Sequence, residues 1–319
     1  QFSNYFPEGL INSKGEKVKI DRTGTVSLRP AEDISVEENI LENTISFINL
    51  LSASSKEDIL TTYGNDDFLK KKIEAYMDYN RPIPLSNEVS ADVNVTRHGY
   101  EVRKIPVIHD YPSLHKQSNE YLVLDFDESG WLVDFNLCIT DDLYDKFVMQ
   151  ATYGKDWGNR QEIIKFIEKY RTAFFTRDIE TIDLMFADEA LILIGRKIQP
   201  KKKSMNEIAY APLPGQPGFE QIQLTKQQYL TRQKQVFNHQ NDIFIDFSTF
   251  EIKKKNNAPD VYGVEMRQNY SSTTYADEGY LFLLIDFREQ YPLIYIRAWQ
   301  PNEWDTNHLI NTSNFRIYK

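Results

Sequence analysis

Two distant stretches of this chain have the form of the same β-hairpin. Segments 120–142 and 279–303 each place apolar, strand-like residues on both sides of a short polar turn. An offset of 161 residues aligns Phe126 with Phe287, Asp125 with Asp286, Glu128 with Glu289, Leu132 with Leu293 and Phe135 with Ile296. An internal repeat constrains the architecture more than a single motif does, because both copies must follow one plan. We therefore expect two related domains in tandem, each ending in a long hairpin.

The openings of the two copies also match. Ser35 with Glu38, and Asn159 with Glu162, form capping-box patterns ahead of apolar residues at helical spacing. An offset of 123 aligns Ile40 with Ile163, Leu41 with Ile164, Phe47 with Tyr170, Ile59 with Ile182 and Tyr63 with Phe186. The second copy thus carries 38 more residues in its middle. These include segment 199–221, whose Pro, Gly and Lys content argues against a helix or a central strand.

Each copy has helical patterns first and strand patterns afterwards, which is typical of an α+β fold with helices on one face of a curved antiparallel sheet. We expect strands at 100–109, 120–126 and 132–139 in the first copy, and at 243–253, 261–270, 280–287 and 293–299 in the second. The length of 319 residues suits two domains. The predicted divisions are an N-terminal extension at 1–33, a first, shorter copy at 34–150 and a second copy at 151–319.

Composition excludes some classes of function. The net charge of -10 argues against binding to nucleic acid, which needs a basic surface. No apolar run is long enough for a transmembrane helix. Cys138 cannot form an internal disulfide alone, and we expect it to be a small buried side chain. A start at Gln1 is typical of a mature exported protein or of a cloned fragment. We expect export to the periplasm, the outer-membrane surface or the medium.

Segment 168–192 holds an aromatic helix pattern, then Asp178, then Phe186-Ala-Asp-Glu-Ala190. This pattern resembles the nuclear-transport-factor-2-like superfamily, or cystatin-like cone fold, over about residues 158–303. The internal repeat extends the resemblance to the first copy, and the whole chain also resembles exported proteins of Bacteroidetes-type bacteria. The resemblance implies a cone-shaped fold but no single activity, because the fold hosts isomerases, dehydratases, cyclases, transport adaptors and interaction modules.

The residues do not form a catalytic pattern of that superfamily. Tyr170 matches the tyrosine of the steroid isomerases, but Ile194 stands where their general base would be, and an isoleucine cannot accept a proton. The first copy has Phe47 in place of the tyrosine. No histidine falls in the later strands that would line a pocket; the five are His98, His109, His115, His239 and His308. We therefore assign no catalytic residue.

We also expect no cofactor and no metal. Segment 125–130 begins like a calcium-binding loop, but Val133 and Asn136 stand where ligands are needed. A hairpin turn explains the segment better. No metal-ligand spacing, nucleophile motif or phosphate-binding loop is present in the sequence.

The candidate binding residues are aromatic or basic. In the last strand, Ile294, Ile296 and Ala298 are predicted to face the helices, while Tyr295, Arg297 and Trp299 share the opposite face with residues of neighbouring strands. We list the candidate ligand contacts as Tyr170, Phe174, Phe186, Arg267, Tyr280, Tyr295, Arg297 and Trp299. An aromatic–arginine face is typical of an interface anchor and of a pocket for an acidic ligand. Ordinary cross-strand packing is the alternative.

These observations favour a non-catalytic binding protein of the cell envelope or exterior, which presents a concave sheet face or an inter-domain groove to a protein, peptide or envelope polymer. The alternative is a small apolar ligand, or an isomerase-, dehydratase- or cyclase-like site, inside the second copy. A third interpretation is that the copies pack together and carry further domains. A homodimer or an internal pseudo-dimer is compatible with the repeat, and the sequence specifies neither the partner nor the oligomeric state.

Overall fold

The structure is a computed structural model of the chain. It describes residues 25–28, 34–53, 56–63, 66–84, 88–91, 93–139, 144, 154–197, 218–256, 258–288 and 291–315. Contacts divide the chain into a first unit, Gln1–Asp141 with Phe175–Arg177, and a second unit, Asp142–Phe174 with Asp178–Lys319. The domain divisions made from the sequence stay a prediction, and most of the expected N-terminal extension lies outside the described residues.

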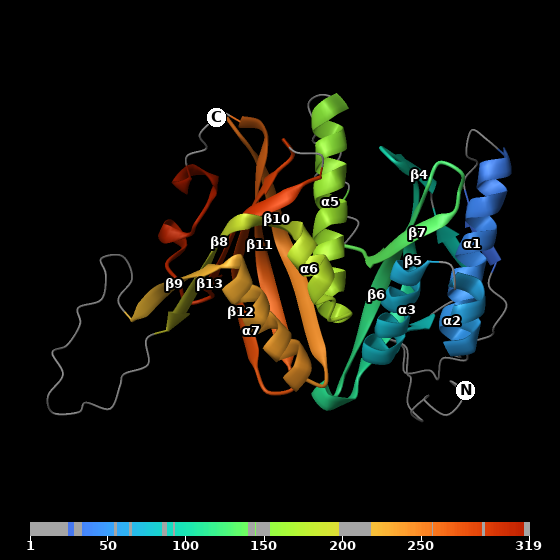
Figure 1. Ribbon diagram of the computed structural model, residues 1–319, viewed down its shortest axis with the longest axis horizontal. Coiled ribbons are helices and arrows are strands. Elements are labelled where there is room, and N and C mark those ends of the chain that lie inside the picture. Colours follow the sequence, from blue (N-terminus) through green and yellow to red (C-terminus); the bar gives the residue numbers. More distant parts are fainter. Residues whose placement is uncertain are drawn as a thin grey trace, which may run out of the picture. The chain divides into compact units, whose positions relative to one another are not determined.

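The first unit has helices first and a sheet afterwards (Figure 1). Its elements are β1 (Thr25–Leu28), α1 (Ile34–Ala53), α2 (Lys56–Tyr63), α3 (Asp67–Asn80), β2 (Ile83–Pro84), β3 (Glu88–Ala91), β4 (Val93–Thr96), β5 (Gly99–Tyr111), η2 (Pro112–Leu114), β6 (Lys116–Phe126) and β7 (Leu132–Leu137). The main sheet has the order β2-β5-β6-β7, with β4 also paired to β5, while β1 and β3 pair in parallel. Beyond the three expected strands, β2 and β4 are short pieces; Pro82 and Pro84, which lack an N–H, keep β2 short.

The second unit repeats this order with a larger sheet (Figure 1). Its elements are α5 (Gly154–Phe175), α6 (Ile179–Met185), β8 (Phe186–Lys197), β9 (Phe219–Thr225), α7 (Lys226–His239), β10 (Ile243–Lys255), β11 (Ala258–Ser272), β12 (Ala276–Asp286), β13 (Leu293–Pro301), η3 (Thr306–His308) and η4 (Thr312–Asn314). The sheet order is β10-β11-β12-β13-β8-β9, and β13 runs parallel to β8 while the other pairs are antiparallel. The α+β class predicted from the sequence is thus confirmed.

The segment 199–221 differs in part from the expectation. Its last residues begin the edge strand β9, which pairs with β8. The rest of the segment, through residue 217, lies outside the described residues. Together β8 and β9 form the part of the second copy that stands between its second and third helices.

Several helix ends follow from side-chain caps. Asp178 accepts a hydrogen bond from the Thr181 amide at 2.9 Å, and Thr225 forms a capping box with Gln228 at the start of α7. The capping box predicted at Asn159 is wrong, because α5 begins earlier, at Gly154. The side-chain Nδ2 of Asn159 instead donates a hydrogen bond to the Tyr262 hydroxyl at 3.3 Å. The side chain of Ser35 lies outside the described residues.

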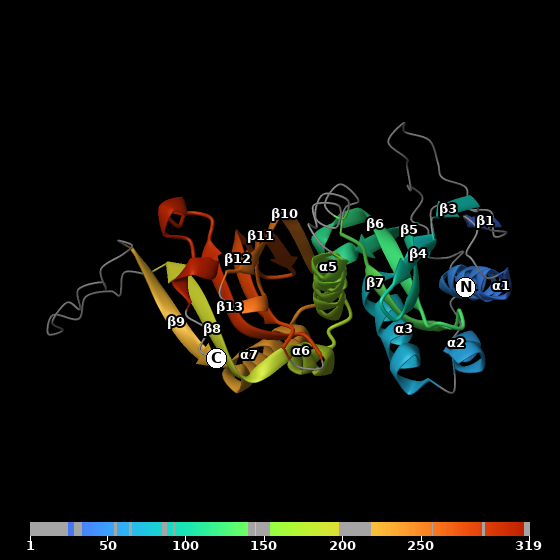
Figure 2. The same ribbon diagram turned by 90° about the horizontal axis from the view of Figure 1, so that it is seen from above.

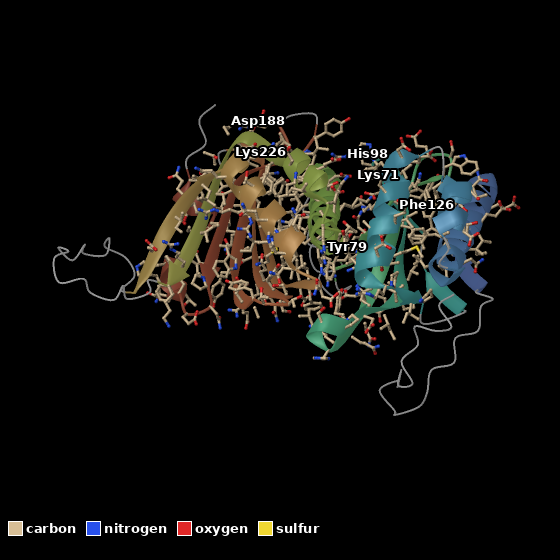
Figure 3. The ribbon with its side chains drawn as sticks, turned by 60° about the horizontal axis from the view of Figure 1, so that its bottom comes forward. Lys71, Tyr79, His98, Phe126, Asp188 and Lys226 are labelled. Carbon is tan, nitrogen blue, oxygen red and sulfur yellow. The ribbon has the colours of Figure 1, made fainter. Side chains whose placement is uncertain are left out.

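Lys226 joins the first turn of α7 to the preceding elements. Its ammonium group donates to the Phe186 carbonyl oxygen at 2.9 Å and forms ion pairs with Asp183 at 2.7 Å and Asp188 at 3.2 Å (Figure 3). These contacts fix the beginning of β8 against α7. They therefore hold Phe186 and Tyr229 in place on the inner side of this unit.

The element bounds support the internal repeat. Helices α2 and α6 begin 123 residues apart, as the openings predicted, and α3 and α7 are 159 residues apart at both ends, 67 to 226 and 80 to 239. Strands β6 and β12 are 160 residues apart at both ends, 116 to 276 and 126 to 286. The aligned core residues Ile40, Phe47, Ile163 and Tyr170 are all 0% exposed.

The two hairpins differ in register by one residue. Leu122 pairs with Leu137 in the first unit, and at an offset of 161 the matching pair would be Leu283 with Ala298. The second unit instead pairs Leu283 with Arg297. A shift of one residue exchanges the faces of a strand. Arg297 therefore takes the place that Leu137 has in the first unit.

This shift overturns the predicted equivalence of Phe135 and Ile296. The Phe135 ring lies 5.0 Å from the ring of Phe47 on α1, on the side of the sheet that faces the helices. Ile296 lies on the opposite, outer side of its sheet, in an apolar cluster formed by Ala258, Val261, Phe282, Leu284, Ile296 and Ala298.

The C-terminal segment 309–315 covers this outer cluster (Figure 2). Phe315 stacks on Phe282 with ring centroids 5.7 Å apart, and Ile310 also packs there. Lys255 donates to the carbonyl oxygens of Thr312 and Phe315 at 2.6 Å. The second sheet is therefore covered by helices on one side and by its own C-terminal segment on the other.

Two smaller predictions from the sequence are confirmed. Segment 125–130 lies in the β6–β7 turn, where Asp127 accepts from the Ser129 and Trp131 amides at 2.9 Å and Gly130 has φ 80°. Cys138 is buried, at 7% exposure.

Replacing Phe282 tests the covered outer side. Phe282→Ala should lower the free energy of unfolding by about 3–5 kcal/mol, because it leaves a cavity beneath the C-terminal segment. Tyr280→Ala, on the same side but only half-buried, should cost about 1 kcal/mol. Urea unfolding of both variants measures the difference. Equal costs would contradict the packing described above.

Candidate functional site

Side chains from two helices and one strand meet on the helix-facing side of the second sheet. Tyr170 and Phe174 come from α5, Tyr229 comes from α7, and Arg297 comes from β13. All four are buried. In the register of the sheet, Arg297 lies opposite Leu283. Trp299, which follows two residues later on the same strand, lies opposite Leu281. Arg297 and Trp299 therefore point to the same side of the sheet.

Three of these residues form what we term the Arg297 cluster, which consists of Tyr170, Tyr229 and Arg297. The Nε of Arg297 donates to the Tyr170 hydroxyl at 3.0 Å. The hydroxyl oxygens of Tyr170 and Tyr229 are 3.2 Å apart, and the Arg297 guanidinium carbon is 5.0 Å from the centroid of the Tyr229 ring. The guanidinium is thus held by one hydroxyl and one aromatic face.

Aromatic rings surround this cluster. Tyr170 contacts Phe174 with centroids 5.0 Å apart and stacks on Phe247 at 6.1 Å. Phe186 lies 5.5 Å from Tyr229. An apolar lining of this kind lowers the local dielectric, so a charge inside it interacts strongly with a partner.

Arg297 carries a charge that the described protein does not neutralise by contact. Its side chain is 6% exposed, and none of the ion pairs among the described residues includes it. Burial acts against the charged form, but the neighbouring Tyr170, Tyr229 and Asp277 outweigh it and raise the pKa of Arg297 above its ordinary value. Burying such a charge without a contacting anion costs several kcal/mol.

The first unit has apolar residues at the equivalent places. Phe47 replaces Tyr170, and by the pairing described above Leu137 replaces Arg297. Both are 0% exposed. A core of this fold therefore packs well without the tyrosine and the arginine, so their presence in the second unit is not a requirement of the architecture.

A second group of polar atoms lies toward the β11–β12 turn on the same side of the sheet. We term it the Gly279 end, formed by Gln268, Gly279 and Trp299. Gln268 is 6% exposed and Trp299 is 9% exposed, yet Gln268 Oε1 and Trp299 Nε1 have no hydrogen-bond partner among the described residues. Leaving such an atom unsatisfied costs about 1–3 kcal/mol.

Asp277 lies next to the Gly279 end, opposite Tyr270. Its Oδ2 accepts a hydrogen bond from the Tyr275 hydroxyl at 2.7 Å, while its Oδ1 is buried without a partner. Burial raises the pKa of Asp277, against the opposing effects of Tyr275 and of the Arg297 charge.

The structure brings some of the sequence-predicted residues together and separates others. Tyr170, Phe174, Phe186 and Arg297 meet in the interior, and Trp299 shares their side of the sheet. Arg267, Tyr280 and Tyr295 lie on the outer side. There the Arg267 guanidinium lies 4.4 Å from the Tyr280 ring centroid and pairs with Glu278, and Tyr295 packs against the outer cluster.

The predicted faces of the last strand were thus reversed. Arg297 and Trp299 face the helices, whereas Ile296 and Ala298 lie beneath the C-terminal segment. That segment buries the outer face of the strand as well. Residues on both faces of β13 are therefore covered, and the presence of apolar residues on one face does not show which face is turned to the helices.

Sequence reasoning did not select four residues of the site, which are Tyr229, Phe247, Gln268 and Asp277. Tyr229 could have been found from the sequence, because the capping box of Thr225 and Gln228 marks the start of α7. The buried residues of this helix are Tyr229, Leu230 and Phe237. Once Arg297 was placed inward, strand pairing would also have selected Gln268 and Asp277.

The described residues offer little other chemistry here. Ile194 pairs with Trp299 in the sheet, so an apolar side chain occupies the position expected for a base. His109 belongs to the first unit, where its ring nitrogens lie 2.6 Å from the Tyr76 hydroxyl and 2.8 Å from the Tyr111 hydroxyl. Within the described ranges, no group of three or more metal-binding side chains occurs, and no helix is long and apolar enough to cross a membrane.

Comparisons with known proteins find likeness in structure only. No protein-family model matches the chain, and no curated protein matches it. An NTF2-like protein of unknown function from Pseudomonas putida is 13% identical with a TM-score of 0.33, and the match covers 47% of this chain and 92% of that one. A cystatin-like-fold protein of unknown function from Nostoc punctiforme is 9% identical with a TM-score of 0.32, covering 47% and 94%.

A third structure, Bd1075 of Bdellovibrio bacteriovorus, is 14% identical with a TM-score of 0.34, covering 67% of this chain and 83% of that one. The first two structures bear the names of the nuclear-transport-factor-2-like, or cystatin-like, fold to which the sequence showed a resemblance. The likeness concerns the fold and assigns no activity to this chain.

The raised pKa of Asp277 has a consequence for stability. Because the pKa of Asp277 is higher in the folded protein, folding favours the protonated carboxyl. The contribution of Asp277 to the free energy of unfolding is therefore fully present below the unfolded pKa, and it is lost as the pH rises through the folded pKa. Asp277→Asn should therefore raise the free energy of unfolding at pH 7, and the gain should shrink below about pH 4. Urea unfolding across this pH range measures it.

The control for this experiment is Glu303→Gln, which removes an exposed carboxyl on the same unit. It should change the stability little at any pH. A difference between Asp277→Asn and the wild type that stays constant with pH would contradict the assigned protonation.

Proposed function

We propose that the second unit binds a small molecule that carries a carboxylate or a similar planar anion on an apolar body. The anion would lie against Arg297, and the body would lie among Phe174, Phe186 and the inner residues of the sheet. This is the small-ligand alternative that the sequence left open, with an anionic group added to it.

The observation that supports this proposal is a buried arginine without an anionic partner. Among the described residues, the hydrogen bond to Tyr170 uses only the Nε of Arg297, and the two terminal nitrogens remain for a ligand. A guanidinium binds a carboxylate through two parallel hydrogen bonds. An anion bound there would offset the cost of burying the charge, so the site is most stable when it is occupied.

The internal repeat supports the same conclusion. The first unit keeps the fold with Phe47 and Leu137, while the second replaces them with Tyr170 and Arg297. Burying a charge is costly unless an opposite charge pairs with it, and the hydrogen bond from Arg297 to Tyr170 supplies no such charge. The ligand site is therefore assigned to the second unit.

Binding fits these residues better than catalysis does. Burial raises the pKa of Tyr229 well above its ordinary value, so its hydroxyl stays neutral and acts as a hydrogen-bonding group. Ile194 offers no base. Binding of a protein, peptide or envelope polymer is a separate prediction that needs another surface, because Arg297 and Trp299 are buried. Export likewise stays a prediction.

The test is the loss of the charge at constant volume. Arg297→Met should weaken binding of benzoate and hexanoate about 10- to 100-fold, the value of a charge-assisted hydrogen-bonded contact. It should leave the stability of the unliganded protein unchanged or raise it, because an uncompensated buried charge is removed. Isothermal titration calorimetry and urea unfolding measure the two effects.

Arg267→Met is the matched control, since it removes an arginine from the outer side of the same sheet. Its affinity for the acids should equal that of the wild type. The proposal fails if the wild type binds neither acid, or if Arg297→Met and Arg267→Met behave alike.

A further inference from the structure

We infer that the ligand also carries a neutral hydroxyl group, displaced from its anionic group along the direction of β13, which is received by Gln268 and Trp299 at the Gly279 end. This inference rests on the proposed function, because it specifies the second polar group of the same ligand. The ligand class is thus a hydroxy acid with an apolar body.

The first step is that two buried atoms with opposite hydrogen-bonding roles lack partners. Gln268 Oε1 is an acceptor and Trp299 Nε1 is a donor, and neither finds a partner in the part of the chain that the structure describes. Both side chains are more than nine-tenths buried, at 6% and 9% exposure. Burying such an atom without a partner is costly, and a single ligand group could serve an acceptor and a donor that are neighbours of one glycine.

The second step is that both residues are neighbours of the same glycine. Gly279 on β12 pairs with Gln268 on β11, and on its other side it pairs with Pro301 on β13. A Cβ on Gly279 would lie 3.0 Å from the Cε2 and Cζ2 atoms of Trp299. Because Cε2 is bonded to Nε1, the indole nitrogen lies near Gly279, and Gly279 pairs with Gln268 on the neighbouring strand.

The third step is chemical complementarity. A hydroxyl can donate to Gln268 Oε1 and accept from Trp299 Nε1 at the same time. An ammonium group could not accept from the indole, and a second carboxylate could not donate to the glutamine. The nearby carboxyl of Asp277 also disfavours a second anion. A neutral hydroxyl is therefore the simplest group that satisfies both atoms.

The fourth step is the spacing between the two ends of the site. Arg297 and Trp299 are two residues apart on β13 and point to the same side, so their Cα atoms are about 7 Å apart. The opposite positions on β12 are Leu283 and Leu281, both buried and apolar. A ligand between the two ends would therefore place an apolar segment over the leucines.

Matched acids test this inference. Benzoate is compared with 4-hydroxybenzoate, and hexanoate with 6-hydroxyhexanoate, by isothermal titration calorimetry on the full chain. The wild type should bind the better-fitting hydroxylated acid about 10-fold more tightly than its parent. Trp299→Phe and Gln268→Leu should each remove that preference while the parent acid keeps its affinity.

Trp304→Phe is the matched control, because this indole is also 9% exposed and has an unpartnered Nε1, but packs against Phe219 elsewhere in the unit. It should keep the preference for the hydroxyl. Circular dichroism and urea unfolding check that each variant is folded. If Trp299→Phe does not fold, the preference of Gln268→Leu for the hydroxylated acid decides the test.

The outcomes separate the two proposals. If parent and hydroxylated acids bind the wild type equally, or if both inner variants retain the preference, the hydroxyl subsite is wrong and the anion site stands. If neither parent nor hydroxylated acid binds, the anion site itself is wrong, and the hydroxyl subsite falls with it.

Discussion

The hydrogen bond from Arg297 to Tyr170 is the interaction on which the proposed binding site of the second unit depends. It joins the last strand to the first helix through the middle of the core, at 3.0 Å, between residues that are almost fully buried. A cation in such a place must be held by fixed dipoles and aromatic faces, because water does not solvate it. Tyr229 supplies both, through its ring and through its hydroxyl contact with Tyr170. Contacts from two helices and from the last strand thus meet at one charge.

The two copies show what that charge adds to the fold. In the first unit, Phe47 packs on Phe135 and Leu137 is buried, which is an ordinary apolar core. In the second unit the pairing of the hairpin is shifted by one residue. The position opposite Leu283, which the alignment gives to Ala298, is therefore held by Arg297. The strand β8 then pairs with β13, next to the arginine. The two units therefore share the order of their helices and the final hairpin, and they differ in the register of that hairpin and in the strands β8 and β9.

Much of the fold could be predicted because it depends on local signals. Helical spacing and the repeat offsets located α1, α2, α5 and α6, and the late strands followed from their apolar runs. The faces of the last strand could not be predicted, because they depend on two distant features. One is the pairing of Leu283 with Arg297, which differs from the alignment by one residue. The other is segment 309–315, which buries Ile296 and Ala298 from outside. Tyr170, Phe174 and Phe186 were selected because helix stripes and the family motif mark them, whereas Gln268 and Asp277 depend on strand pairing alone.

Gly279 shows that the interior is shaped for more than packing. A side chain there would collide with the Gln300 carbonyl oxygen at 2.4 Å and with the Trp299 indole, so the indole can lie over β12 only because the residue is glycine. Glycine within a strand weakens it, since it contributes no side chain to the core. The arrangement accepts that loss, together with an unpartnered indole N–H and an unpartnered glutamine oxygen. Gln268 and Trp299 each carry a buried polar atom without a partner among the described residues, and the Arg297 cation lies two residues before Trp299 on β13. Each of these features costs stability on the same side of the sheet. The ligand that we propose would supply a partner to all three.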